Sequence, residues 1–538
     1  MKKRLAMLFS LSLITSSFLA ACSYGNDSAD ATTGGKKVLN IVEPSEIPTM
    51  DSGKAKDAAS SLPLRNTMEG LYRVGEGDKI VDGMAEGEPT VSPDGLTYTF
   101  KIRDAKWSNG DTVTANDFEY AWKRAIDPAT KSQYSFIMFD LKNAKKASKG
   151  EVGVDQVGVK ALDEKTLEIQ LEKPVPYFKN LLTFYTFLPV NKKAVEEHGD
   201  KYGTTADTLV FNGPFTMSEW KTTSYKLVKN DTYWDKDVVK LDEVNTQIIK
   251  EVSTAVNLYE TNELDFARLT SEHVANYKEH AEFAVRQDPS VFYLRFNQKN
   301  DVLKNEKARK AIDLSYNKQG IAETILNNGS VPAKFFVPQN FAKDENGKDF
   351  RSLNGDLWTG TTEDAKKLWA EAKKELGKDT MKLEFLTSDT ESAKKIAEFI
   401  KGDLEKNLAG LTVDIKQVPF KQKLDLEAKS DYQMTMVGWG PDYQDPMTFL
   451  DMFVKGHTQN NFNYDNPAYD ELIKKAQNSN DNAERWAAMA EAEKMLDAEA
   501  VISPIYQRST AYILKDKVKN LYMHAVGGEF SYKWVDLK

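Results

Sequence analysis

The spacing of apolar residues in the first third of the chain predicts short strands and one clear amphipathic helix. Residues 38–42 form an apolar run typical of a strand. Between residues 90 and 103, apolar and polar side chains alternate around a Pro-Asp-Gly turn, which predicts a hairpin. A helix is expected from about Thr114, because apolar residues follow it at helical spacing, and Asp127-Pro128 should end it.

The second half of the chain alternates between the two kinds of periodicity. Strands are predicted at 293–296, 381–386 and 411–418, and helices at 308–315, 362–377 and 396–410. Strands that alternate with helices are typical of an α/β lobe whose sheet is at least partly parallel.

The N-terminus has the pattern of a secretory signal. A basic start at residues 2–4 precedes an apolar run to Ala21, and small residues lead directly to Cys22. These small residues before a cysteine resemble the lipobox of bacterial lipoproteins, in which Cys22 would be lipidated after cleavage. An ordinary signal peptide with an incidental cysteine is the alternative. Residues 22–37 are small and polar and are expected to form a flexible tether.

Composition narrows the possible functions. The 538 residues are too many for one simple domain, so two or three lobes are expected. The net charge of −9 argues against a nucleic-acid partner. A single cysteine excludes a disulfide framework and cysteine-based metal sites, and the five histidines show no HExxH spacing. We find no hydrolase elbow or nucleotide-binding loop, and expect no catalytic residue, metal or cofactor.

One aromatic segment is a candidate binding site. Asp442 lies between Trp439 and Tyr443 in a Gly/Pro-rich stretch directly after a strand-like run. Strand ends of α/β sheets face binding crevices, where a carboxylate can hold a cation. The other reading is a turn aspartate that caps its own backbone, and the residues alone leave both readings open.

Several long motifs resemble the extracellular oligopeptide-binding lipoproteins of peptide ABC importers, the family 5 bacterial extracellular solute-binding proteins. They occur in family order over nearly the whole chain after the signal, and they read VSPDGLTYTFKIR (91–103), KWSNGD (106–111), TANDFEYAWKR (114–124), FNGPF (211–215), YWD (233–235), RKAID (309–313) and GWGPDYQDP (438–446).

The resemblance implies an α/β, two-lobed fold like that of the periplasmic binding proteins (type II, large peptide-binding class) with an extra inserted subdomain. Lobe I would comprise 38–63, 188–286 and 508–538, the inserted subdomain 64–187, and lobe II 287–507. The hinge strands should then lie near residues 286 and 507.

The resemblance also implies a peptide site. In this family an aspartate of the Trp-x-x-Asp motif holds the α-ammonium of the peptide, which corresponds to Asp442. The peptide-binding residues expected on this basis are Asp442, Trp439, Gly438, Phe420, Tyr134, Tyr443, Tyr293 and Asn297. For Tyr293 and Asn297, core packing is the alternative.

Two departures from the family pattern leave the peptide's C-terminal contact open. Met436 stands where some relatives carry an arginine that can meet a carboxylate, and Ser60 stands where the family has an acidic residue. Lys429 is one candidate partner for that carboxylate.

The expected function is capture of oligopeptides between two closing lobes and delivery to the permease subunits of an ABC importer. The protein would be a monomer, lipid-anchored through Cys22 on the outer face of a single-membrane bacterium. A pheromone-capturing receptor of the same fold is one alternative, and a binding protein for a non-peptide solute is another. A secreted enzyme is a third, and it would need a nucleophile or metal set that the sequence lacks.

Overall fold

The computed structural model describes residues 35–175, 177–344, 346–479, 481–526 and 530–538. The predicted signal peptide, Cys22 and all but the last three residues of the predicted tether lie outside these ranges. Residues 37–538 belong to one unit. Within the described ranges, no helix has the length and hydrophobicity needed to cross a membrane.

The lobe I residues form a four-stranded sheet in the order β1-β10-β9-β8. β1 pairs in parallel with β10, and the other neighbours are antiparallel. The elements of lobe I are β1 (Val38–Glu43), α5 (Lys192–His198), β8 (Phe215–Lys221), β9 (Ser224–Lys229), β10 (Glu243–Ile248), α6 (Val252–Glu260), β11 (Phe266–Leu269) and α7 (Glu272–Tyr277).

The inserted subdomain holds a second four-stranded sheet, β4-β5-β7-β6, covered by α2 (Ala115–Ile126). The predicted hairpin is confirmed by the antiparallel pairing of β4 and β5, and the predicted helix by a capping box at Thr114. The other elements are α1 (Ala58–Thr67), which begins in lobe I, β2 (Tyr72–Val74), β3 (Ile80–Asp82), β4 (Thr90–Val91), β5 (Thr97–Lys101), α3 (Ala144–Ala147), β6 (Val159–Asp163), β7 (Thr166–Gln170) and α4 (Phe178–Leu181).

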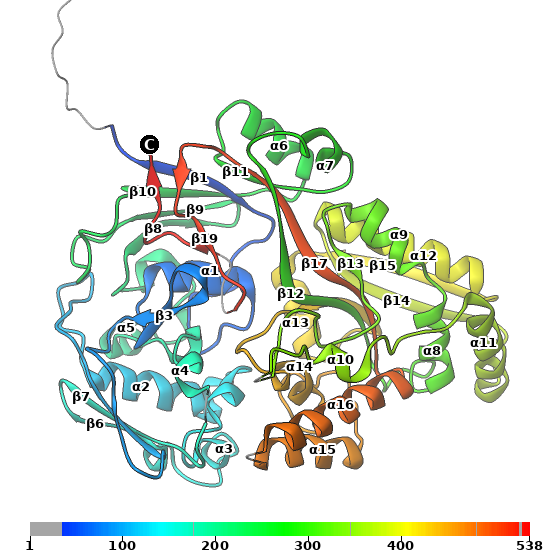
Figure 1. The fold of residues 1–538 in the computed structure, drawn as a ribbon, viewed down its shortest axis with the longest axis horizontal. Helices are drawn as coiled ribbons and strands as arrows, with labels where there is room; N and C mark the ends of the chain where they lie inside the picture. Colours follow the sequence, from blue (N-terminus) through cyan, green and yellow to red (C-terminus); the bar gives the residue numbers. More distant parts are fainter. Residues whose placement is uncertain (1–34, 176, 345, 480, 527–529) are drawn as a thin grey trace, which may run out of the picture. The chain divides into compact units, whose positions relative to one another are not determined.

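Two long antiparallel strands, β12 (Phe283–Phe296) and β17 (Ile502–Leu514), run side by side through the third sheet (Figure 1). Each contains one of the predicted hinge positions, 286 and 507, and their pairing shifts register between Gln287 and Val291. The sheet has the order β11-β17-β12-β16-β14-β15, so both strands continue from lobe I into lobe II. The exact lobe boundaries stay a prediction.

The far part of this sheet is parallel, which confirms the expected α/β pattern. β14 pairs in parallel with both β15 and β16, and α12 packs on β14 and β15. The elements of lobe II are α8 (Glu306–Leu314), α9 (Lys318–Gly320), β13 (Val331–Pro332), α10 (Arg351–Asn354), α11 (Thr362–Leu376), β14 (Met381–Ser388), α12 (Glu391–Asn407), β15 (Leu411–Val418), α13 (Phe420–Ala428), β16 (Met434–Trp439), α14 (Met447–Leu450), α15 (Pro467–Asn478) and α16 (Asn482–Ala498).

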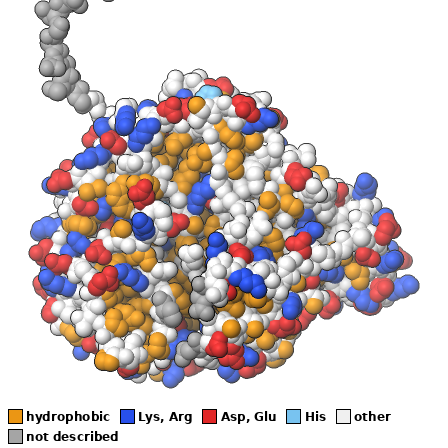
Figure 2. All heavy atoms as spheres, in the orientation of Figure 1, with side chains coloured by type: hydrophobic (Ala, Val, Ile, Leu, Met, Phe, Trp, Pro, Cys, Tyr) orange, Lys and Arg blue, Asp and Glu red, His pale blue; other side chains and the backbone are white. Residues whose placement is uncertain are grey.

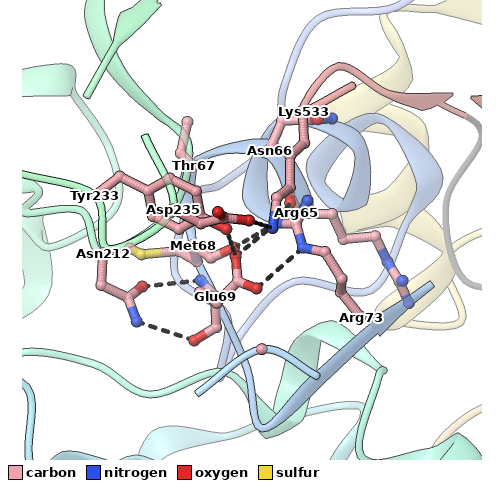
Figure 3. Close-up of polar contacts among 12 residues, drawn as sticks. Arg65, Asn66, Thr67, Met68, Glu69, Arg73, Asn212, Tyr233, Asp235 and Lys533 are labelled. Atoms are coloured by element: carbon pink, nitrogen blue, oxygen red, sulfur yellow. Dashed lines mark hydrogen bonds and ion pairs between the residues drawn. The ribbon is translucent and has the colours of Figure 1, made fainter. Parts of the chain in front are cut away.

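A buried polar network joins the inserted subdomain to lobe I (Figure 3). The fully buried Glu69 carboxylate accepts hydrogen bonds from Arg73 Nε (3.2 Å) and Tyr233 Oη (2.8 Å). Asn212 bonds the backbone of Glu69, and Lys533 pairs with Asp235 beside it. Because these charges are paired inside the protein, removing one partner would leave an uncompensated buried charge at this junction. The short C-terminal strands near Lys533 are β18 (Val518–Lys519), β19 (Tyr522–Met523), β20 (Phe530–Ser531) and β21 (Asp536–Leu537).

The surface charges are mixed in sign. On the face that Figure 2 shows, acidic and basic side chains alternate without a large patch of either. On this face the side chains do not form a basic stripe like those of nucleic-acid-binding proteins.

Candidate functional site

The candidate site begins at an incompletely paired strand. β16 pairs with β12 along its length, from Met434 to Trp439. It pairs with β14 only at Met434 and Thr435, so among the described strands none covers that edge of β16 from Met436 to Trp439. Gly438 is exposed there, between two buried neighbours. Free backbone groups at a strand edge are a template for pairing with another extended chain.

The loop after β16 is held by one threonine. The Asp442 N–H donates to Thr448 Oγ1 (3.0 Å), and Trp439 Nε1 donates to the Thr448 carbonyl (2.8 Å). Thr448 is a buried residue of α14. The indole and the aspartate therefore have fixed relative positions.

The inserted subdomain covers this loop with aromatic side chains. Tyr134 Oη donates to the Asp442 carboxylate, 3.1 Å from Oδ1 and 3.2 Å from Oδ2. Its ring is stacked on Trp439, with 6.3 Å between centroids and an interplanar angle of 11°. Tyr177 is likewise stacked on Tyr443 at 5.0 Å. Four of the residues predicted for the site are thus brought together from two parts of the chain.

The Asp442 carboxylate is buried, and no ion pair to it forms among the described residues. The residue is 7 % exposed, and among the described residues the bonds to its carboxylate come from Tyr134. Burial raises the pKa of Asp442 well above its usual range, and the nearby Asp451 adds to this, whereas Tyr134 and Arg65 oppose it. In the described part of the chain, the Asp442 carboxylate accepts hydrogen bonds from Tyr134 and not from the backbone of its own turn. This favours the interpretation as a ligand-binding carboxylate over that as a turn cap.

The remaining predicted residues lie elsewhere in lobe II. Tyr293 is fully buried, and its Oη accepts a hydrogen bond from Arg295 (2.9 Å). The Asn297 amide donates to the carbonyls of Ser430 and Tyr432. Both side chains thus have the contacts of core packing. Phe420 is the half-buried first residue of α13.

The residues where the chain departs from the family pattern also have local partners. Ser60 lies in the first turn of α1 and donates to Asp57, the N-cap of that helix (3.0 Å). Met436 is 7 % exposed, in the core of lobe II, and Lys429 caps the end of α13. These placements do not identify a partner for a ligand carboxylate.

Sequence reasoning missed several residues around Asp442. They are Arg65, Tyr177, Phe184, Tyr185, Thr448 and Asp451. Burial and neighbouring carboxylates raise the pKa of Asp451 to about 7. Three of the six come from residues 177–187, whose high aromatic content was a detectable signal.

A polar groove of about 960 Å³ lies beside the Asp442 loop. Tyr177 and Asn180 of the inserted subdomain line one side, and Gln444 and Asp445 are among the lobe II residues opposite. Asp445 is paired with Arg485 at 3.0 Å. Within the described part of the chain, no group of His, Cys, Asp or Glu is arranged to hold a metal ion.

Comparison with known proteins agrees with this geometry. The family description "Bacterial extracellular solute-binding proteins, family 5 Middle" matches residues 79–461. The oligopeptide-binding protein OppA of Bacillus subtilis is 34 % identical, and the alignment covers 98 % of each chain. The substrate-binding domain of an oligopeptide ABC transporter from Bacillus anthracis is 47 % identical, with a TM-score of 0.92 over 94 % of this chain and 99 % of that one.

A second solved structure, of the pheromone receptor PrgZ, is 36 % identical, with a TM-score of 0.90 over 94 % of this chain and all of that chain. Its match has nearly the same extent as that of the Bacillus anthracis protein. The fold, the motif order and the family match agree, and the chain belongs to the family 5 bacterial extracellular solute-binding proteins.

Proposed function

We propose that this protein captures oligopeptides outside the cytoplasm and delivers them to the permease of an ABC importer. The observation that carries the proposal is the buried Asp442 carboxylate, which has no ion pair among the described residues and lies between lobe II and the inserted subdomain. The names of its relatives, which are oligopeptide-binding proteins and an oligopeptide transporter domain, support the same substrate class.

The ligand's α-ammonium would bind at Asp442. A charge-assisted hydrogen bond to a carboxylate contributes roughly 1.5–3 kcal/mol, more than a neutral one. The ammonium also places a positive charge in direct contact with the buried carboxylate, so binding favours the ionised form of Asp442. Tyr134 would keep the carboxylate in position from the opposite side.

The peptide backbone would pair with the free edge of β16. Residues 436–439 offer main-chain donors and acceptors that are independent of the ligand's sequence. Position 438 requires glycine, because a Cβ there would meet the Phe292 ring of the paired strand β12 at 2.7 Å. Backbone pairing combined with a terminal-charge contact gives affinity for many peptides.

Closure of the lobes would follow from bending in β12 and β17. These two strands connect the proposed lobes, and the register shift between Gln287 and Val291 lies next to the proposed boundary. A bulge interrupts the ladder and bends a strand, which suits a hinge position. The domain boundaries given above are part of this proposal.

A pheromone receptor is the second candidate, because the PrgZ match is nearly as extensive as the others. Screening a peptide library separates the two: broad binding indicates nutrient uptake, whereas one strongly preferred apolar peptide indicates signalling. Preferred binding of a non-peptide solute would overturn both.

Membrane attachment through Cys22 is also proposed, with the protein acting as a monomer. The support is the lipobox-like sequence before the only cysteine. Two or three acyl chains give stable anchoring, whereas one is marginal. Cys22→Ala should release the protein from the membrane fraction, and retention of that variant would contradict the proposal.

The deciding experiment is mass spectrometry of ligand that co-purifies with the folded protein. We expect intact extended peptides with free N-termini in the wild type, and reduced retention in Asp442→Ala. The matched control is Asp414→Ala, which removes an exposed carboxylate from the same lobe. Cleaved products formed during incubation, or equal retention by both variants, would contradict the proposed binding function.

A further inference from the structure

One lysine contacts all three parts of the protein. Lys56 lies between β1 and α1 in lobe I, and its Nζ donates to Gln133 Oε1 of the inserted subdomain (3.0 Å). The same ammonium donates to the Leu424 carbonyl on α13 of lobe II (3.1 Å). Lys56 is half-buried. A single charged group therefore crosses both boundaries around the proposed peptide site.

Gln133 extends this contact toward Asp442. Its backbone carbonyl accepts a hydrogen bond from Thr458 Oγ1 of lobe II. The next residue, Tyr134, donates to Asp442, and Phe136 packs on the His457 ring with 4.2 Å between centroids. The segment from Gln133 to Phe136 therefore contacts lobe II through both its backbone and its side chains, next to the proposed ammonium site.

Burial of Lys56 is partly offset by the acidic side chains around it. Burial lowers the pKa of Lys56, but Glu427 and Asp425 of α13 and the neighbouring Asp57 raise it, while Arg295 acts in the same direction as burial. An ammonium that donates to an amide oxygen and a carbonyl makes stronger hydrogen bonds than a neutral donor. Two of these acidic groups lie on lobe II, so their attraction also depends on lobe II being close.

We propose that Lys56, Gln133 and Thr458 form a closure clasp that sets how stable the closed state is, and through it the affinity for every peptide. This inference rests on the proposed function. The bonds of the clasp to lobe II exist only when lobe II is close to the other two parts. If a ligand binds only the closed state, its apparent Kd rises by the same factor by which the population of the closed state falls. The clasp residues are positioning residues and need no contact with the ligand.

The test compares Lys56→Met with Lys54→Met in the full chain. Lys54 lies two residues away, is 37 % exposed, and pairs at 4.0 Å with Asp51 of the same lobe. We expect Lys56→Met to raise Kd about tenfold, as for loss of one charged hydrogen bond, through faster dissociation. Lys54→Met should stay within twofold of wild type. Lys56→Arg should recover most of the affinity, and Thr458→Val should raise Kd about threefold.

Two readouts separate a clasp from other roles. Lys56→Met should weaken free and N-acetylated peptides by the same factor, whereas Asp442→Asn should weaken mainly the free ones. In the ligand-free protein, hydrogen exchange should speed up at residues 132–138 and 455–460 in Lys56→Met but not in Lys54→Met.

Three outcomes would overturn the clasp. They are an unchanged Kd in Lys56→Met, a changed ratio between free and acetylated peptides, and a lower melting temperature without faster exchange at these two segments. If the wild type binds no peptide, the proposed function fails, and the ligand-free exchange still decides the clasp.

Discussion

Replacing Asp442 with asparagine tests the ammonium site with a minimal change in shape. The substitution removes one negative charge, and the new amide oxygen can still accept the hydrogen bond from Tyr134. Burial already raises the pKa of Asp442, so the charge opposes folding of the unliganded protein. The free energy of unfolding of Asp442→Asn should therefore equal or exceed that of the wild type.

Peptide affinity should change in the opposite direction. Loss of a charge-assisted hydrogen bond of about 1.5–3 kcal/mol raises Kd roughly 10- to 150-fold for a peptide with a free N-terminus. An N-acetylated peptide lacks the ammonium, so its Kd should be nearly the same for both proteins. The preference of the wild type for free over acetylated peptide should therefore disappear in the variant.

The pH dependence has a defined sign. At low pH the raised pKa of Asp442 means that a proton must leave before the ammonium can bind, so affinity falls as pH decreases. Above about pH 8 the peptide's α-amino group loses its charge, and affinity falls again. Asp442→Asn should lose the acidic limb of this bell-shaped profile.

Isothermal titration calorimetry with one tripeptide and its N-acetylated form, from pH 4 to pH 9, measures all of these quantities. Thermal unfolding of the free proteins supplies the stability comparison. The reasoning is refuted if Asp442→Asn weakens both peptides equally. It is also refuted if the variant binds the free peptide as tightly as the wild type.

Four further predictions follow from the contacts described. Tyr134→Phe removes the hydroxyl that donates to the proposed ammonium-binding carboxylate. The Kd measured by calorimetry should rise about threefold to tenfold, and an unchanged Kd would contradict this. Gly438→Val forces a side chain against the Phe292 ring of the paired strand β12, which should lower the unfolding free energy by about 1–3 kcal/mol. Because the clash also distorts β16, peptide affinity should fall at least tenfold, and full binding would exclude this strand edge from the site. Glu493 is fully buried and paired with Arg351. Glu493→Ala should therefore lower the free energy of unfolding, measured in urea, by about 3–5 kcal/mol. A decrease below about 1 kcal/mol would show that the pair is dispensable. Burial lowers the pKa of His457 to about 3, so as pH falls below 6.5 the unfolded chain binds a proton at this histidine before the folded protein does. The free energy of unfolding of the wild type should therefore fall by about 1–2 kcal/mol between pH 7 and pH 5, relative to that of His457→Gln. Parallel pH profiles of the two proteins would refute this.

Local patterns in the sequence were sufficient to predict many elements. The hairpin around the Pro-Asp-Gly turn, the capped helix from Thr114 and the strand–helix alternation of lobe II appear at nearly the expected positions. Each depends on residues within one or two turns of each other. Periodicity and capping act at that range, so one stretch of sequence contains the whole signal.

The candidate site was predictable only in part. The motif around Trp439 and Asp442 identified the loop, but its residues alone could not separate a ligand carboxylate from a turn cap. At Tyr293 the sequence pattern was compatible with both a site and a core residue, and the structure shows it buried and bonded to Arg295. Local sequence says which residues form a strand, but not what covers each face.

The sequence by itself determined the elements, the family motifs and the aspartate to examine. Only the tertiary structure decided that Tyr134, 308 residues away, bonds Asp442, and that Lys56 reaches both Gln133 and Leu424. These contacts depend on how lobe II packs against the rest of the chain. Burial and the nearby Asp451, which raise the pKa of Asp442, arise from that packing and have no signature in the residues next to Asp442 in the sequence.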